Sequence, residues 1–184
     1  MTYTIESAVS RLLSSYKAYY DITTFEEDDN PLVAVCEYYE SAHKYVLSHK
    51  AELWAANSEE FIFLFRMDHL TLPEYEKCRD YALEEGMKRA HIGPGHMYTY
   101  ITPTFICEEC DGNALKALRK TRIYKSFRFS FHGWMDFHTA VFETMHDRIS
   151  SNTGGIPVKK GMKRVLFNPD KGSKNIRKRS EFSK

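Results

Sequence analysis

The stretch from His132 to His138, HGWMDFH, holds the residue types best suited to chemistry. If it stays a strand, Asp136 and His138 are neighbours on one face, about 6 to 7 Å apart along the chain. A carboxylate and an imidazole at that spacing could bind one cation or act as an acid–base pair. If the chain turns at Gly133 and Trp134 instead, His132 and Asp136 flank the turn. A third alternative is a partly exposed sheet face on which His and Asp only bond to each other.

A parity pattern extends this stretch in both directions. Phe residues at 127, 129 and 131 alternate with polar residues, which predicts one packed face and one polar face. The run is too long for an ordinary strand, so we expect a bend at Gly133 and favour a β-bulge over a tight turn. The candidate polar face then comprises Arg128, His132, Trp134, Asp136 and His138.

Cys107 and Cys110 have the spacing that lets two thiolates share a zinc ion. Tetrahedral zinc needs two further ligands, and the sequence has no second such pair, so these cysteines are weak metal candidates. A redox role is also disfavoured, because Glu108 and Glu109 oppose a lowered thiol pKa. We expect no cofactor, and no recognisable nucleophile elbow, phosphate-binding loop or dinucleotide-binding turn occurs. The sequence therefore favours a protein that is not an enzyme.

Basic residues gather in two places. One is a predicted helix near residues 113–122; the other is the segment 159–184, where ten Lys and Arg against two acids leave +8, while the rest of the chain carries −7. Such groups could contact nucleic-acid phosphates, with nearby aromatic rings stacking on bases, or could only aid solubility. The weak nucleic-acid candidates are Lys116, Arg119, Lys120 and Arg122.

Composition indicates a folded cytoplasmic protein. The 184 residues are 42% hydrophobic and 14% aromatic, too apolar for a disordered chain. No apolar run approaches the ~18 residues of a membrane span, and the N-terminus lacks the pattern of a signal peptide. Four scattered cysteines predict reduced thiols. We therefore expect no membrane contact, and a partner that is a protein or a second copy.

The periodicity predicts an α+β fold with a mixed sheet. We expect one domain over residues 1–156 and a basic, flexible tail over 157–184. Pro103 argues for an edge position of the strand 98–107 or for a bulge within it. Thr71 and Glu74 predict the start of the helix that precedes that strand. The expected order is an N-terminal helix near 4–20, an antiparallel meander of strands 32–39, 44–55 and 61–67, a helix from 71, a β-α-β crossover within 96–142 and a C-terminal hairpin.

Two segments carry a family resemblance: Tyr-Tyr-Asp-Ile at 19–22 and the run from Lys125 to Trp134. Over residues 4–152 the chain resembles a family of small cytoplasmic proteins from clostridia and related Gram-positive bacteria, to which no function is assigned. The element order also looks like the core of the PD-(D/E)xK nucleases. The metal-binding spacing of those enzymes is missing, since Glu37, Glu40 with Lys44, and Lys50 with Glu52 do not fit it.

Three hypotheses follow. The leading one is a non-catalytic binding or assembly domain. The second is a nucleic-acid-associated or degenerate PD-(D/E)xK nuclease-like protein. The third is a metal-dependent enzyme that uses His132, Asp136 and His138.

Overall fold

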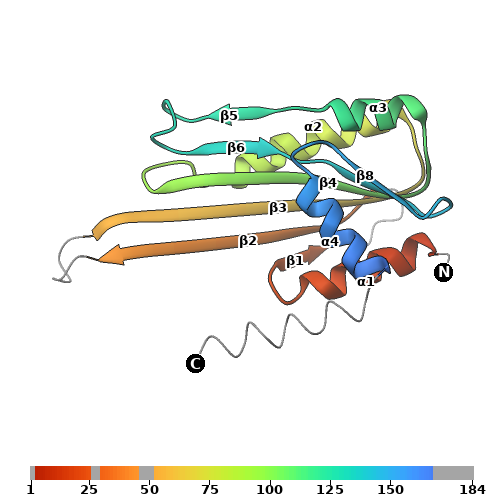
Figure 1. Cartoon of the computed structure of the whole chain (residues 1–184), viewed down its shortest axis with the longest axis horizontal. Helices are drawn as coiled ribbons and strands as arrows, with labels where there is room; N and C mark the ends of the chain where they lie inside the picture. Colours follow the sequence, from red (N-terminus) through yellow and green to blue (C-terminus); the bar gives the residue numbers. More distant parts are fainter. Residues whose placement is uncertain (1–2, 26–29, 46–51, 168–184) are drawn as a thin grey trace.

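The computed structural model describes residues 3–25, 30–45 and 52–167, with side chains described outside 41–56 (Figure 1). It contains helices and a mixed sheet, as the sequence predicts. The helices are α1 (Ile5–Tyr16), α2 (Leu72–Arg89), α3 (Gly112–Lys120) and α4 (Ile156–Phe167). The strands are β1 (Asp21–Thr24), β2 (Leu32–Tyr45), β3 (Glu52–Leu70), β4 (His96–Cys110), β5 (Tyr124–Ser126), β6 (Trp134–Phe137), β7 (Ala140–Glu143) and β8 (Arg148–Ser151).

The sheet has the order β1-β2-β3-β4-β6-β5, with β7 also beside β4 and β8 beside β7. The first three strands form an antiparallel meander, and β4 runs parallel to β3 on one side and to β6 and β7 on the other. The predicted β-α-β crossover is thus confirmed as β4-α3-β6. The C-terminal hairpin is confirmed as β7-β8.

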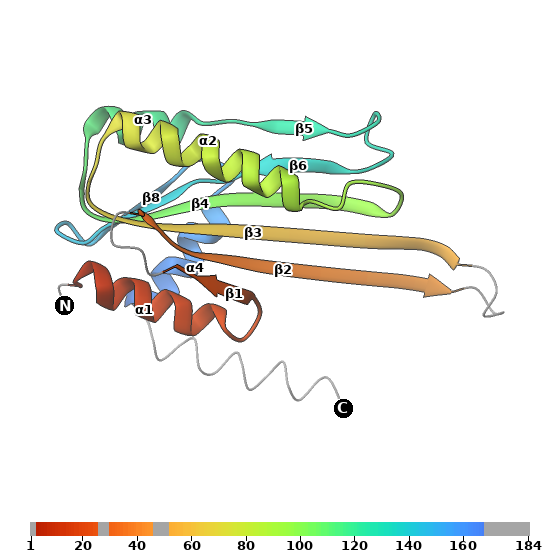
Figure 2. The same cartoon turned by 180° about the vertical axis from the view of Figure 1, so that it is seen from behind.

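Helices cover both sides of the sheet (Figures 1 and 2). On the α2/α3 side, Phe61, Phe63 and Phe65 of β3 pack with the helices in one buried cluster. On the α1/α4 side, Leu64 and Ile106 join a second cluster. Strand alternation explains the division, because successive side chains of β3 point to opposite faces. An apolar run on both faces therefore marks a central strand.

The predicted meander has wrong strand boundaries. The breaks expected at residues 40–43 and 57–60 are continuous strand, and the connection between β2 and β3 falls within 46–51, outside the part of the chain that is described. Polar residues suggested the breaks. Glu59 is instead 3% exposed and hydrogen-bonded within the sheet, so a polar residue here marks a buried contact and not a turn.

The edge position predicted for the strand with Pro103 is also wrong, because β4 is central. On one side β4 pairs with β6 up to Ile101 and with β7 from Thr104. Ile101 accepts from His138 on that side, and residues two apart point the same way, so Pro103 faces the gap between β6 and β7. Its missing N–H therefore costs no ladder hydrogen bond.

The segment assigned to the basic tail from residue 157 begins with a packed helix. Met162 and Leu166 of α4 are 1% and 2% exposed and belong to the cluster that includes α1. Arg11 donates to the Val165 carbonyl oxygen at 2.8 Å, which ties α4 to α1. Residues 168–184 lie outside the described residues. Within the described ranges no helix is long and apolar enough to cross a membrane.

Two helical glycines give a matched test of the packing on the α2/α3 side. A Cβ on Gly86 would lie 2.7 to 2.9 Å from three atoms of the Ile101 side chain, whereas a Cβ on Gly161 in α4 meets nothing within 4 Å. Gly86→Ala is expected to lower the free energy of unfolding by about 1–3 kcal/mol through overpacking. Gly161→Ala should raise it by up to about 1 kcal/mol, because alanine favours the helix. Denaturant unfolding measures both, and equal effects would contradict this packing.

Candidate functional site

The stretch around Gly133 forms a hairpin loop between β5 and β6, so the favoured β-bulge is wrong. The loop spans residues 127–133, and Trp134, which the alternative placed in the turn, is the first residue of β6. Strands β5 and β6 pair antiparallel, and the Phe127 N–H donates to the Gly133 carbonyl oxygen at 3.0 Å. Gly133 has φ 68°, and a Cβ there would lie 2.2 Å from the Met97 carbonyl oxygen. Only glycine fits this close approach of backbone to backbone.

The loop separates the residues of the predicted polar face. Arg128 and His132 leave the sheet with the loop, while Trp134, Asp136 and His138 stay beside β4. The expected packing of the Phe residues at 129 and 131 is also wrong, since their exposed fractions are 96% and 81%. The prediction from alternating residues is wrong here because the backbone of residues 128–130 is left-handed, so successive side chains do not point to opposite faces as they do in a strand.

The retained residues join a larger surface on the α1/α4 side of the sheet. The helices lie over one end of that side, and the opposite ends of β2, β3 and β4 extend beyond them (Figure 1). The strand register places two cross-strand rows on this end, which none of the described helices covers. The first row runs Tyr38, Glu60, Tyr100, Asp136, Tyr124, and the second runs Glu40, Ser58, Tyr98, Trp134, Ser126. We name these two rows the tyrosine–carboxylate face.

Aromatic rings on this face lie side by side. The Tyr98 and Tyr100 ring centroids are 4.7 Å apart with an interplanar angle of 31°, and Tyr98 and Trp134 are 6.0 Å apart at the same angle. Tyr100 and His138 are 4.5 Å apart at 30°. Inclined rings in such a series form an apolar platform on which a flat or cationic group can rest.

The pair predicted from the sequence, Asp136 and His138, lies beside Tyr100 at one end of this series of rings. His138 Nε2 is 3.3 Å from Asp136 Oδ2, with the His138 side chain 8% exposed and that of Asp136 39% exposed. The loop before α4 closes over the pair, since a Cβ on Gly154 would lie 2.6 Å from His138 Cδ2. Asp136 Oδ1 accepts from the Phe137 N–H at 3.0 Å. The carboxylate is thus positioned and accessible, whereas the imidazole is nearly buried.

Two phenols, Tyr20 and Tyr100, stay protonated at neutral pH. Tyr20 donates to Glu60 Oε2 at 2.7 Å, and burial, followed by the nearby Glu60 charge, raises the pKa of Tyr20. Burial also raises the pKa of Tyr100, with further contributions from Tyr98, Asp136 and Glu60. The rows contain no Lys or Arg. The charges of the two rows are therefore carboxylates only.

The other sequence candidates lie elsewhere. Cys107 and Cys110 are buried free thiols, and burial raises the pKa of Cys110 to about 12, which opposes the thiolate that zinc binding or redox chemistry requires. Among the residues described, no three His, Cys, Asp or Glu side chains gather as metal ligands, so His132 does not complete a site with Asp136 and His138. The basic residues Lys116, Arg119 and Lys120 lie on α3, which packs on the opposite side of the sheet.

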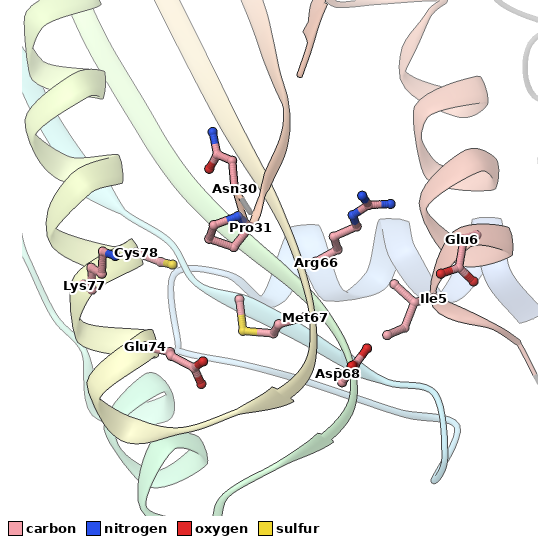
Figure 3. A pocket seen from close by; sticks show the side chains of 10 residues that line it. All are labelled: Ile5, Glu6, Asn30, Pro31, Arg66, Met67, Asp68, Glu74, Lys77 and Cys78. Carbon is pink, nitrogen blue, oxygen red and sulfur yellow. The ribbon is translucent and has the colours of Figure 1, made fainter. Parts of the chain in front are cut away.

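A cavity of about 560 Å³ lies at the far end of the sheet (Figure 3). Arg66 and Glu6 lie on the α1 side of β3, and Met67 and Glu74 lie on the α2 side. Glu74 is already engaged, because its Oε2 accepts from the Thr71 N–H at 3.0 Å and the Thr71 hydroxyl at 2.7 Å in the predicted helix cap. The cavity thus has lining residues on both sides of β3.

Sequence reasoning missed most of the tyrosine–carboxylate face. Its signal was present in each strand as polar or aromatic residues at alternate positions, as in Tyr38 and Glu40, or Tyr98 and Tyr100. The register between distant strands was needed to align them into rows.

Comparison with protein families identifies a family for most of the chain. The family model described as Domain of unknown function (DUF8052) matches residues 4–164. No curated protein and no solved structure matches the chain.

The half-buried phenols of Tyr16 and Tyr20 predict a loss of stability in alkali. Burial raises the pKa of Tyr16 and Tyr20 well above the unfolded value of 10.0. Below pH ~9 both states keep these protons. Above pH ~10 only the unfolded chain loses them, so the free energy of unfolding should fall by about 1.4 kcal/mol per pH unit for each tyrosine. Denaturant unfolding from pH 8 to 11 measures this slope.

Two variants test the assignment of that slope. Tyr20→Phe should make it shallower by the share of one tyrosine, and Tyr19→Phe, at a position 49% exposed, should leave it unchanged. The same slope in all three proteins would contradict the assignment.

Proposed function

We propose that this chain, which belongs to the family of the domain of unknown function DUF8052, is a non-catalytic binding domain. Its ligand lies on the tyrosine–carboxylate face and is an extended, cationic, peptide-like segment. One observation carries the proposal: phenol rings and carboxylates alternate across β2, β3, β4, β6 and β5 in a row with no basic residue.

The chemistry of the row suits cations. A guanidinium or ammonium group gains from the faces of Tyr and Trp rings and from charge-assisted hydrogen bonds to carboxylates. Glu60 and Asp136 stand on strands separated by β4, so their backbones are about 10 Å apart at the usual strand spacing of ~4.8 Å. An extended peptide in the polyproline II conformation has three residues per turn and rises ~3.1 Å per residue, so side chains three positions apart lie on the same side, about 9 Å from each other. Basic residues three positions apart therefore match the two carboxylates.

The same charges disfavour nucleic acid on this face, because carboxylates repel a phosphate chain. The alternative of a nucleic-acid-associated protein stays a prediction that concerns Lys116, Arg119, Lys120 and Arg122. A gel shift at low ionic strength tests it. The metal-dependent alternative stays a prediction for Asp136 and His138, which elemental analysis of the purified protein tests.

Three further predictions from the sequence remain proposals. These are a cytoplasmic location, an origin among clostridia or related Gram-positive bacteria, and one domain over residues 1–156 with a basic tail beyond it.

A basic peptide tests the proposed function. The probe is an unstructured nonapeptide with Arg at every third position, and the control peptide has Gln in place of Arg. Binding is followed through Trp134 fluorescence, with Trp134→Phe identifying the signal. We expect the Arg peptide to bind with a salt-dependent affinity and the Gln peptide to bind at least tenfold more weakly, since each tenfold corresponds to about 1.4 kcal/mol.

Matched variants locate the binding surface. Glu60→Gln combined with Asp136→Asn keeps side-chain size and should weaken the Arg peptide at least tenfold. Glu76→Gln, at an exposed position of α2 on the other side of the sheet, should leave the affinity unchanged. Equal affinity for both peptides, or equal loss in both variants, would overturn the proposal.

A further inference from the structure

Residues 127–133, here the Phe loop, present two apolar rings to solvent. Phe129 and Phe131 have exposed fractions of 96% and 81%, the highest of any large hydrophobic side chain in the described part of the molecule. The loop lies at the end of the β5-β6 hairpin, away from α3 (Figures 1 and 2). Two such rings at one tip are a feature of contact surfaces.

The conformation that exposes the rings is strained and held in place. Arg128, Phe129 and Ser130 have φ of 48°, 53° and 67°, a left-handed run that side chains disfavour. Hydrogen bonds inside the loop fix it, with the His132 N–H donating to the Phe127 carbonyl oxygen at 3.1 Å. Strain that the surroundings maintain points to a use for the conformation.

A buried network anchors the loop to the sheet. The His132 carbonyl oxygen accepts from His96 Nδ1 at 2.7 Å, and the ring of His96, a residue 4% exposed, lies 2.8 Å through Nε2 from the Thr99 hydroxyl. Thr99 donates to Glu59 at 3.1 Å, and Glu59 also accepts from the His91 N–H. This network therefore fixes the backbone of the loop that carries Phe129 and Phe131.

Charge identifies the partner surface. The sequence has Lys125 and Arg128 at the loop and no acidic residue between Gly112 and Met135. The loop is thus a cationic, aromatic segment, which is the ligand chemistry proposed for the tyrosine–carboxylate face. An anionic bilayer is a poorer match, because the surface hollow that Lys125 lines also contains Asp80, Glu84 and Lys88 of α2 and so has no excess of positive charge.

From this complementarity we infer that the Phe loop of one chain docks on the tyrosine–carboxylate face of a second copy. The inference rests on the proposed function and names its partner. Gly133 of the loop directly precedes Trp134 of the face, so two copies related by a twofold axis can each place a loop on the other's face. Such a contact is closed and self-complementary. In it Arg128 meets Asp136 or Glu60, and the Phe rings meet Tyr98 and Trp134.

Sedimentation velocity over a hundredfold range of protein concentration tests the inference on the full chain. We expect a concentration-dependent dimer in the wild type. Phe129→Ser with Phe131→Ser should shift the dissociation constant at least tenfold toward monomer, with circular dichroism and thermal unfolding showing that the fold is kept. Met145→Ser, at a position 64% exposed in the β7-β8 turn, is the control and should dimerise as the wild type does.

A charge exchange tests which surfaces meet. Arg128→Glu alone and Asp136→Arg alone should each weaken the homodimer, because like charges then face each other. A mixture of the two variants should form a heterodimer, because every facing pair is again opposite in charge. A wild type that is monomeric throughout, a serine double variant that dimerises like the wild type, or a mixture without heterodimer would each overturn the inference.

The result is separable from that of the proposed function. If the Arg peptide binds and the protein is monomeric, the face has another cationic partner and only the inference falls. If the wild type is monomeric and binds phosphatidylserine vesicles through the Phe rings, the loop contacts lipid and the inference is likewise overturned. If the carboxylate variants change neither the affinity for the Arg peptide nor the dimerisation, the proposed function and the inference are both overturned.

Discussion

A mismatch in length between strands and helices governs this structure. Strand β3 has 19 residues, about 60 Å of extended chain, whereas α1 and α4 have 12 residues each, or about 18 Å. Two such helices packed at one end cannot cover the α1/α4 side of the sheet. Their apolar contacts, with Leu64 and Ile106 beneath them, end where the helices end. Beyond that point the same strands must carry side chains that tolerate water.

Beyond α1 and α4, the strand positions that face water are occupied by tyrosine and tryptophan and not by charged residues alone. An aromatic ring with a polar tip can lie half-buried against its neighbours and still hydrate its edge. The carboxylates of Glu60 and Asp136 stand between these rings, and the Tyr20 hydroxyl bonds one of them. The side chains that suit a long exposed sheet thus also leave a surface that is acidic and aromatic.

The Phe loop beside this surface exposes its aromatic rings instead of packing them against neighbours. Its rings could have been buried by an ordinary strand parity, yet residues 128–130 adopt a left-handed backbone that turns two Phe side chains outward. The buried chain from Glu59 through Thr99 and His96 to the His132 carbonyl holds it there. Cationic loop and acidic face adjoin in one molecule, which is the arrangement a reciprocal contact between copies needs.

Local patterns determined much of the fold. The Thr71 and Glu74 cap, the apolar period of α2, the β4-α3-β6 crossover and the final hairpin follow from neighbours a few residues apart, so the sequence predicts them. The pair Asp136 and His138 was also visible, because two residues on one strand share a face. The tertiary structure alone decided the rest. Whether Gly133 bends or bulges depends on its approach to Met97, the place of Pro103 depends on a gap in a neighbouring strand, and the rows depend on the register of five strands. Register and close approach are long-range packing choices, and no local spacing encodes them.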